Sequence, residues 1–465
     1  MELQTEYDVL VVGAGPGGYV AAIRAAQLGL KAAVIEKDKA GGVCLNIGCI
    51  PSKSLIHQAE VFQSIQGLEA MGLSVDRTGF DYKKVYEKSR QAADRLSKGV
   101  QFLLKKNGID LLAGTVTQVR QGSVTLEDGR VLSGKNILLA PGSRPRELTG
   151  FTFDEKQVLS STGAVLLQSL PKKLLILGAG AIGVEFAHIM NAFGVEVHLV
   201  EMMDRILPLE DEETVEVLAR SFKKRGIRTD VSTKAVSQSV VDGKLVIELE
   251  DKTGNRQTVE ADQVLVSAGR IPNTAGLGLA EAGVQMDEGG FVQVGDYYET
   301  TVPGIYAVGD VIRTPLLAHV ASKEGEIAVE RIAGHKTMPR IDPLSIPSAV
   351  YSEPQIASFG LTEKAALEKG IAFKKATFPY RGAGKSVAIE QLEGMVKVLT
   401  DAATGEILGA HIVGAEATEL IHEVLLARQA ELLTEDIADM IHAHPTLSET
   451  VMEAMRASED RAIHV

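Results

Sequence analysis

Two stretches of the chain repeat the same pattern of hydrophobic and polar positions. Each begins with a short apolar run, at residues 7–12 and again at residues 174–177, which is typical of a buried parallel strand. A glycine-rich turn follows, then a segment of small apolar residues that predicts a helix. Each stretch closes on a second apolar run that ends in a glutamate, Glu36 or Glu201. The pattern predicts two βαβ units in one chain.

The glycine turns of the two units have the same spacing. Gly178 follows Gly13 by 165 positions, and Glu201 follows Glu36 by 165 positions. A lone G-x-G-x-x-G turn is a weak signal, but here each turn lies between a predicted strand and a predicted helix and precedes an acidic residue at the spacing of a dinucleotide fold. Phosphates would contact the two helix N-termini, and each glutamate would accept hydrogen bonds from a ribose; the alternative for the glutamates is a solvated strand end. The predicted phosphate-binding glycines are Gly13, Gly15 and Gly18 in the first turn and Gly178, Gly180 and Gly183 in the second.

The last quarter of the chain has a different pattern. Apolar strands at residues 395–399 and 407–413 precede amphipathic helices from Thr418 and Thr446, and no glycine-rich phosphate turn occurs there. This predicts a separate α+β domain, plausible as a subunit interface. The predicted fold class is therefore α/β, with two Rossmann-like dinucleotide-binding domains and a C-terminal α+β domain. The predicted segments are 1–150 for the first domain, 151–272 for the second, 273–342 for a return to the first, and 343–465 for the interface domain.

Composition narrows the class of protein. The chain has 465 residues, 45% of them hydrophobic, and a formal net charge of −13 without a Lys/Arg-rich run. Such a charge opposes binding to nucleic acid and to acidic membrane surfaces. No apolar run is long enough to span a bilayer, and the acidic stretch 1–6 does not resemble a leader peptide. We expect no nucleic acid, no membrane insertion, and a reducing compartment such as the cytoplasm.

The only two cysteines, Cys44 and Cys49, lie five positions apart. On a continuous helix they would be separated by about 7.5 Å along the axis and would point to different sides. A disulfide needs Cα atoms closer than about 7 Å, so a bridge requires a break in the helix, which Gly48 and Pro51 would permit. Zinc is disfavoured because a structural site wants four ligands at closer spacings. Spacing alone favours two inert thiols, whereas the adjoining dinucleotide site favours a redox-active pair.

Three segments carry a family resemblance: residues 41–53 around the cysteines, residues 301–310, and residues 442–449. They resemble the signatures of the pyridine nucleotide-disulfide oxidoreductases, in particular the dihydrolipoamide dehydrogenases. The resemblance runs from Tyr7 to about Arg456. It implies FAD in the first dinucleotide domain, NAD in the second, and dimerisation through the third.

The resemblance also implies roles for particular residues. Cys44 would exchange with the substrate and Cys49 would contact the flavin as a thiolate. His444 would be the general base, oriented by Glu449, although Thr446-x-x-Glu449 is equally a capping box with Thr446 as N-cap. Lys53 would lie near the flavin and pair with Glu185. The other implied contacts are Glu36, Gly41, Gly42, Lys53, Gly114, Asp310 and Ala318 for FAD, and Glu201, Ala235 and Gly269 for NAD.

The implied partners are a second copy of the chain, dihydrolipoamide, and a lipoyl-bearing acyltransferase (E2) or glycine cleavage carrier protein. Because no lipoyl domain precedes Tyr7, the lipoyl group is expected on another chain. A glutathione-reductase-like enzyme is the first alternative, but carboxylates at Glu201 and Asp204 would repel the 2′-phosphate of NADPH. A redox-silent flavoprotein is the second. Val43 and Pro141 depart from the family pattern, which usually has threonine at these turns, so hydroxyl contacts to the cofactor are not expected there.

Overall fold

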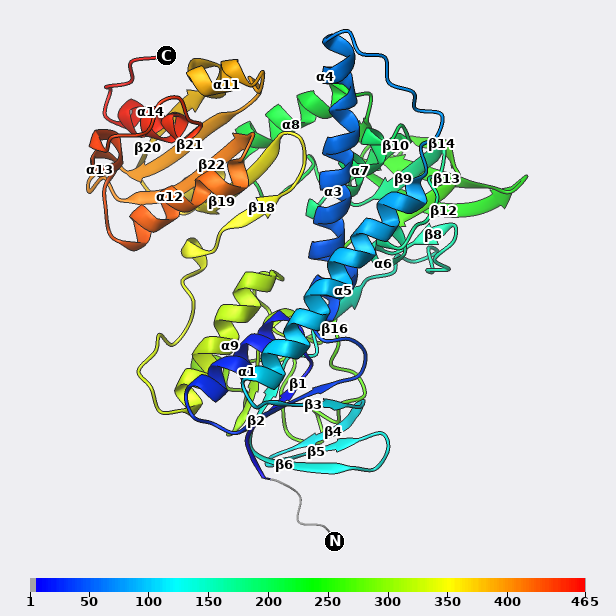
Figure 1. Ribbon diagram of the computed structural model, residues 1–465, viewed down its shortest axis with the longest axis vertical. Coiled ribbons are helices and arrows are strands. Elements are labelled where there is room, and N and C mark those ends of the chain that lie inside the picture. The colour runs from blue at the N-terminus through cyan, green and yellow to red at the C-terminus, as the bar shows by residue number, and fades with distance from the viewer. Residues whose placement is uncertain (1–5, 465) are drawn as a thin grey trace.

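The computed structural model describes residues 6–464, so the acidic segment 1–5 and the outermost limits of the predicted domains lie outside the described residues. The described chain forms three bodies (Figure 1): one at the bottom that contains β1 and α9, one at the upper right around β9 and β10, and one at the upper left around β19 and β22. The two long helices α3 and α5 run alongside each other from the first body to the second, and α3 packs on α7.

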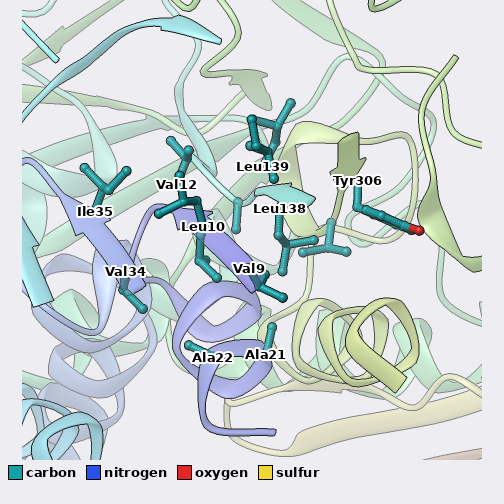
Figure 2. Packing of buried hydrophobic residues seen from close by; sticks show 14 of the residues in the cluster. Val9, Leu10, Val12, Ala21, Ala22, Val34, Ile35, Leu138, Leu139 and Tyr306 are labelled. Carbon is teal, nitrogen blue, oxygen red and sulfur yellow. The ribbon is translucent and has the colours of Figure 1, made fainter. Parts of the chain in front are cut away.

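The first body is a dinucleotide-binding fold assembled from two distant parts of the chain. Strand β17 joins the parallel sheet by pairing with β6, and helices α1 (Pro16–Gln27) and α9 (Ala318–Ile332) pack closely against each other. Apolar side chains of β1, including Val9 and Leu10, meet Ala21 and Ala22 of α1 in the core (Figure 2). The order β3-β2-β1-β6-β17 has the bounds Asp110–Ala113, Ala32–Glu36, Tyr7–Val12, Val131–Leu139 and Ile305–Ala307, and β4 (Val116–Arg120) and β5 (Ser123–Leu126) extend the sheet from β6.

The second body repeats this plan. Its five strands are all parallel, helix α7 (Ala181–Ala192) follows the second glycine turn, and a three-stranded antiparallel sheet lies at one side. The prediction of two βαβ units is confirmed. The sheet order β11-β10-β9-β15-β8 has the bounds Arg228–Asp230, Glu196–Val200, Lys173–Leu177, Gln263–Val266 and Val158–Leu159, and the antiparallel strands are β12 (Thr233–Val241), β13 (Lys244–Asp251) and β14 (Arg256–Ala261).

Where the chain crosses between these two bodies, β7 (Ser143–Pro145) pairs antiparallel with β16 (Arg270–Pro272). The segment that leaves the first body and the segment that returns to it therefore run side by side. The core of the first body accordingly draws on residues before 141 and after 276. We propose the divisions near 150, 272 and 342 as domain boundaries on this basis.

The third body is the α+β unit expected from the sequence. Its antiparallel sheet carries helices α12 (Ala417–Gln429) and α14 (Ser448–Ser458), which pack on β19, β20, β21 and β22. The order β18-β19-β22-β21-β20 has the bounds Ser348–Val350, Gln355–Gly360, Ile407–Gly414, Met395–Asp401 and Phe373–Pro379.

The remaining helices are mostly short, and among the described residues none is long and apolar enough to cross a membrane. They are α2 (Gly42–Ile47), α3 (Cys49–Gln63), α4 (Ile65–Ala70), α5 (Tyr82–Lys106), α6 (Ser161–Val165), α8 (Glu212–Lys224), α10 (Glu363–Glu368), α11 (Gly384–Ala388) and α13 (Thr434–Asp439), with the 3-10 turns η1 (Asp296–Tyr298), η2 (Gly309–Val311), η3 (Pro343–Ser345) and η4 (Tyr380–Gly382).

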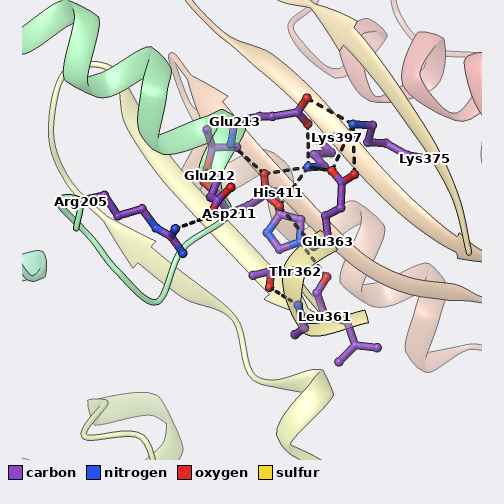
Figure 3. Close-up of polar contacts among 12 residues, drawn as sticks. Arg205, Asp211, Glu212, Glu213, Leu361, Thr362, Glu363, Lys375, Lys397 and His411 are labelled. Atoms are coloured by element: carbon purple, nitrogen blue, oxygen red, sulfur yellow. Dashed lines mark hydrogen bonds and ion pairs between the residues drawn. The ribbon is translucent and has the colours of Figure 1, made fainter. Parts of the chain in front are cut away.

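A buried ion cluster joins the second body to the third (Figure 3). Lys397 on β21 is 1% exposed, and its ammonium lies 2.9 Å from Asp211, 2.6 Å from Glu213 and 2.7 Å from Glu363. Asp211 is also the N-cap of α8. Burial opposes the charge of Lys397, but hydrogen bonds to Glu213, Glu363 and Asp211 raise its pKa overall. These contacts hold α8 against the third sheet.

Neutralising Lys397 should destabilise the protein, because Asp211 would remain buried without its partner. We expect Lys397→Met to lower the free energy of unfolding by about 3 kcal/mol or more. The control is Lys375→Met, which removes a lysine 36% exposed that also contacts Glu213 and Glu363. Its loss should cost less than about 1 kcal/mol. Equal losses for the two variants, measured by denaturant titration, would contradict the importance of the buried pair.

Candidate functional site

The two cysteines lie on either side of a break between two helices. Cys44 is in α2, Cys49 is the first residue of α3, and Gly48 between them has φ −137° and ψ −117°. A Cβ at Gly48 would lie 2.9 Å from the carbonyl oxygen of Val43, so the chain can turn this tightly only with glycine there. The predicted helix break is confirmed. Both thiols are free, so the structure describes the dithiol form.

The two thiols have opposite electrostatic properties. The hydrogen bond from Cys44 lowers the pKa of Cys49 to about 7, and the Lys53 ammonium contributes to this shift while burial opposes it. The same hydrogen bond and burial raise the pKa of Cys44. Loss of a proton from the pair is therefore favoured at Cys49, the thiol next to Lys53. A thiolate at one defined position is the form of cysteine that reacts.

Lys53 and Glu185 form the ion pair that the resemblance implied. The Lys53 ammonium lies 3.0 Å and 2.9 Å from the two carboxylate oxygens of Glu185, which belongs to α7 of the second body. A third residue, missed in the sequence, completes the group. The backbone N–H of Tyr351 donates a hydrogen bond to Glu185 at 3.2 Å. The centroid of the Tyr351 ring lies 4.2 Å from the Lys53 ammonium. Tyr351 follows β18 in the third body, so only the fold brings it here.

The first glycine turn has one glycine, Gly15, whose backbone is not covered by neighbouring atoms. A Cβ at Gly13, whose φ is +101°, would lie 2.3 Å from the carbonyl oxygen of Ala140, and a Cβ at Gly18 would lie 1.9 Å from that of Gly13. A Cβ at Gly15 would meet no atom within 4 Å. Gly42 packs so closely that its Cβ would lie 2.7 Å from Gly15 Cα. Packing thus requires the outer glycines, whereas Gly15 exposes the backbone of the helix N-terminus, as a pyrophosphate needs.

The second turn repeats this geometry. A Cβ at Gly178, whose φ is +103°, would lie 2.7 Å from the carbonyl oxygen of Ser267. One at Gly183 would lie 1.9 Å from the carbonyl oxygen of Gly178, and one at Gly180 would meet nothing within 4 Å. Both turns therefore fit a dinucleotide.

The glutamates at the ends of β2 and β10 have a role in the structure that the sequence did not predict. Glu36 accepts hydrogen bonds from the backbone N–H of Ala14 at 2.7 Å and of Asp38 at 2.9 Å. At the equivalent place Glu201 accepts from Ala179 at 2.7 Å and from Met203 at 2.8 Å. Each carboxylate thus anchors its own glycine turn. Its oxygens keep further lone pairs, which can accept from a ribose.

Asp310, in η2, is surrounded by polar residues that the sequence did not reveal. Ser143 donates to its carboxylate at 2.5 Å, and the Arg270 guanidinium lies 3.5 Å away. The backbone N–H of Gly309, the residue before Asp310, donates a hydrogen bond to Glu324 at 2.7 Å. Burial raises the pKa of Glu324 to about 7. The N-termini of β7 and β16 thus place Ser143 and Arg270 beside the predicted flavin contact.

The other predicted cofactor residues come from several elements of the first two bodies. Gly41, with φ +96°, donates to the carbonyl oxygen of Ala14 at 2.8 Å, and Gly114 donates to that of Glu36 at 3.0 Å. Ala318 begins α9, so its backbone belongs to a helix N-terminus. The remaining two are Ala235, at a bulge in β12, and Gly269, with φ +102° just before β16.

His444 and Glu449 form a pair on the third body. The His444 Nδ1 atom lies 3.0 Å from one carboxylate oxygen of Glu449, and the backbone N–H of Thr446 donates to the other at 2.9 Å. Burial opposes the charge of Glu449, but these two contacts lower its pKa overall. One carboxylate therefore serves both the histidine and half of a capping box. The predicted N-cap is wrong: α14 begins at Ser448, because the Thr446 hydroxyl donates to Ala443 instead.

Within one chain, no hydrogen bond or ion pair among residues 6–464 joins His444 to either thiol. The His444 side chain is 76% exposed. The structure thus assembles two separate groups, the thiols with Lys53 and Glu185, and His444 with Glu449.

Comparison with known proteins identifies the family. Residues 7–325 match the pyridine nucleotide-disulphide oxidoreductase family, and residues 346–455 match its dimerisation domain. The chain belongs to the pyridine nucleotide-disulphide oxidoreductases. As a member of this family it is an oxidoreductase that uses FAD and NAD, which agrees with the two glycine turns.

Similar family members cover nearly the whole chain. A dihydrolipoyl dehydrogenase of Bacillus subtilis is 42% identical over 99% of this chain and 98% of its own length, and one of Chlorobaculum tepidum is 44% identical over 97% of each. Among solved structures, LpdA from Mycobacterium tuberculosis has a TM-score of 0.89 at 28% identity, covering 97% of this chain and 99% of its own. The HOCl-induced flavoprotein disulfide reductase RclA from Escherichia coli has a TM-score of 0.86 at 25% identity, with the same coverage.

The open positions in the two turns allow a direct test of cofactor assignment. Gly15 and Gly180 have φ of −69° and −70°, so valine is compatible with the backbone at both. We expect Gly15→Val to fold but to lose FAD binding, because its side chain would fill the pyrophosphate position. Gly180→Val should retain FAD and lose NAD binding. Flavin absorbance and NAD titration measure the two effects, and loss of the opposite cofactor in either variant would contradict the assignment.

Proposed function

We propose that this chain is the dihydrolipoyl dehydrogenase (E3) component of a 2-oxoacid dehydrogenase or glycine cleavage complex. It oxidises protein-bound dihydrolipoamide to lipoamide through the Cys44–Cys49 disulfide and reduces NAD to NADH. The observation that carries this proposal is the pair of thiols on either side of the break at Gly48, beside the Lys53–Glu185 ion pair and with Cys44 on a helix whose first residue packs on the first glycine turn. The relatives named dihydrolipoyl dehydrogenase support the choice of substrate.

The chemistry follows from the difference between the two thiols. His444 removes a proton from one substrate thiol, and the resulting thiolate attacks Sγ of Cys44 in the oxidised pair. Cys49 leaves because the thiol with the lower pKa is the better leaving group. The second substrate thiolate then attacks the mixed disulfide at the substrate sulfur, which forms lipoamide and releases Cys44. The proton of this second substrate thiol passes to Cys44, so two electrons remain on the cysteine pair.

Bound FAD would supply the electron carrier between the cysteine pair and the nicotinamide of NAD. The chain's own contribution is to hold the negative charge at Cys49. The Lys53 ammonium lies close enough to lower the pKa of that thiol, and Glu185 fixes the ammonium in place. Pro51, in the first turn of α3, is buried and helps to hold the turn.

The second site favours NAD over NADP. A cavity of about 490 Å³ at the end of the Glu201 strand is lined by Met202 and Lys234, among others. The Lys234 ammonium pairs with Glu250 at 2.8 Å, so its charge is already compensated. Glu201 would repel a 2′-phosphate at the adenosine ribose.

The active site is shared between two subunits of a homodimer. His444 is exposed and lies on the body that matches the dimerisation domain, whereas the cysteines lie on the first body. A two-fold axis would place the histidine of one subunit at the thiols of the other. The lipoyl group comes from an E2 acyltransferase or a glycine cleavage carrier protein, and the reaction takes place in the cytoplasm, where a catalytic disulfide can be reduced.

Steady-state rates test the substrate and the nucleotide together. The protein should oxidise dihydrolipoamide rapidly with NAD and slowly with NADP, and it should reduce glutathione disulfide poorly with NADPH. Glu201→Arg should narrow the preference for NAD, since it replaces the repelling carboxylate by a cation. A wild-type protein that prefers NADPH and glutathione disulfide would instead be a glutathione-reductase-like enzyme.

Mixed dimers test the shared site. Cys44→Ser and His444→Ala homodimers should each be inactive, but unfolding and reassembling them together should restore activity. In a heterodimer one site combines both defects, and the other joins an intact Cys44 to an intact His444. Random pairing gives about a quarter of wild-type activity at most. Confirmed heterodimers with no more activity than the parents would show that each site lies within one chain.

A further inference from the structure

Tyr351 connects all three bodies at the thiol site. Its backbone N–H donates to Glu185 on α7, and its ring face lies against Lys53 on α3. The ring centroid is 4.2 Å from the Lys53 ammonium, within the distance of about 6 Å at which a cation is attracted to an aromatic face. The tyrosine itself is partly buried. Lys53 thus has two partners, a carboxylate and an aromatic ring.

The position of the ammonium matters because its charge helps to lower the pKa of Cys49. A lysine side chain has four rotatable bonds, and that of Lys53 is 33% exposed, so the Glu185 pair alone leaves it competing with water. The ring covers one side of the ammonium and excludes water there. We propose that Tyr351 is a positioning residue of the redox site, whose ring face holds the Lys53 ammonium where it stabilises the Cys49 thiolate.

The phenol hydroxyl has a lesser part in this arrangement. Burial raises the pKa of Tyr351, and the charges of Glu185, Glu419 and Cys49 add to that shift while Lys53 opposes it. The side chain therefore stays neutral in the working range of the thiols, and its effect on Lys53 comes from the ring. The ionisable groups that face the thiol pair from the packed elements are Tyr19 of α1, Lys53 of α3, Glu185 of α7 and Tyr351.

The test separates the ring from the hydroxyl. Tyr351→Phe keeps the aromatic face, whereas Tyr351→Leu keeps apolar bulk without it, and both keep the backbone hydrogen bond to Glu185. In the reduced holoenzyme, the long-wavelength thiolate-to-flavin absorbance is titrated with pH under anaerobic conditions. We expect the midpoint of Tyr351→Phe to match the wild type. The midpoint of Tyr351→Leu should rise by about half a unit to one unit, because the ammonium becomes more mobile and more screened by water.

A matched control is Tyr297→Leu, which removes a similar contact, with Arg331 at 4.8 Å, away from the thiols. Its midpoint should not move. The proposal is overturned if Tyr351→Leu titrates like the wild type, if Tyr351→Phe shifts equally, or if the control shifts as well. A fall in thermal stability alone would not reproduce a selective shift in this midpoint.

The inference rests on the proposed relay, but it can fail independently of it. Absence of the band in the wild type would refute the relay, whereas a band with an unshifted midpoint in Tyr351→Leu refutes only the role of Tyr351. The pH dependence of Cys49 alkylation by iodoacetamide, measured on the reduced apoprotein, gives a second reading without FAD. Tyr351→Met serves in that assay as another side chain of similar bulk without an aromatic face, and it should shift the profile in the same direction as leucine.

Discussion

The interaction between the Cys44 and Cys49 thiols across the break at Gly48 is the one on which the rest of the site depends. It gives two chemically identical side chains different pKa values, and therefore different roles. It can form only because the helix breaks at Gly48, where a larger residue would collide with the carbonyl oxygen of Val43. The Lys53 ammonium then further favours the thiolate of Cys49. Without the break the thiols would point to different sides of one helix.

The three bodies are held in register around this pair by polar contacts. Glu185 and Tyr351 bring the second and third bodies to Lys53, and the cluster around Lys397 fixes α8 to the third sheet. Buried ion pairs of this kind add little net stability compared with apolar contacts, but they require one geometry. A site assembled from three bodies needs such a constraint, because a small displacement of Glu185 would move the Lys53 ammonium, which helps to lower the pKa of Cys49.

The sequence predicts the features that depend only on residues close together in the chain, such as the glycine turns and the helix break. Glycines at fixed spacing predict the turns, because no other residue fits at Gly13 or Gly18, and five-residue spacing predicts the helix break. Contacts between distant segments are different. Tyr351, Ser143 and Arg270 carry no local pattern, and only the assembled fold shows what they touch. At the start of α14 two local signals competed, and the hydrogen bond of Thr446 to Ala443 moved the helix start to Ser448.

The central claim is that reducing equivalents rest on the cysteine pair with the negative charge on Cys49 next to the flavin. The most direct measurement is the absorbance spectrum of the holoenzyme after anaerobic addition of NADH or dihydrolipoamide. Either reductant should produce a long-wavelength thiolate-to-flavin band, and this band should be absent in Cys49→Ser. Reduction that bleaches the flavin without this band, or a band that persists in Cys49→Ser, would contradict it.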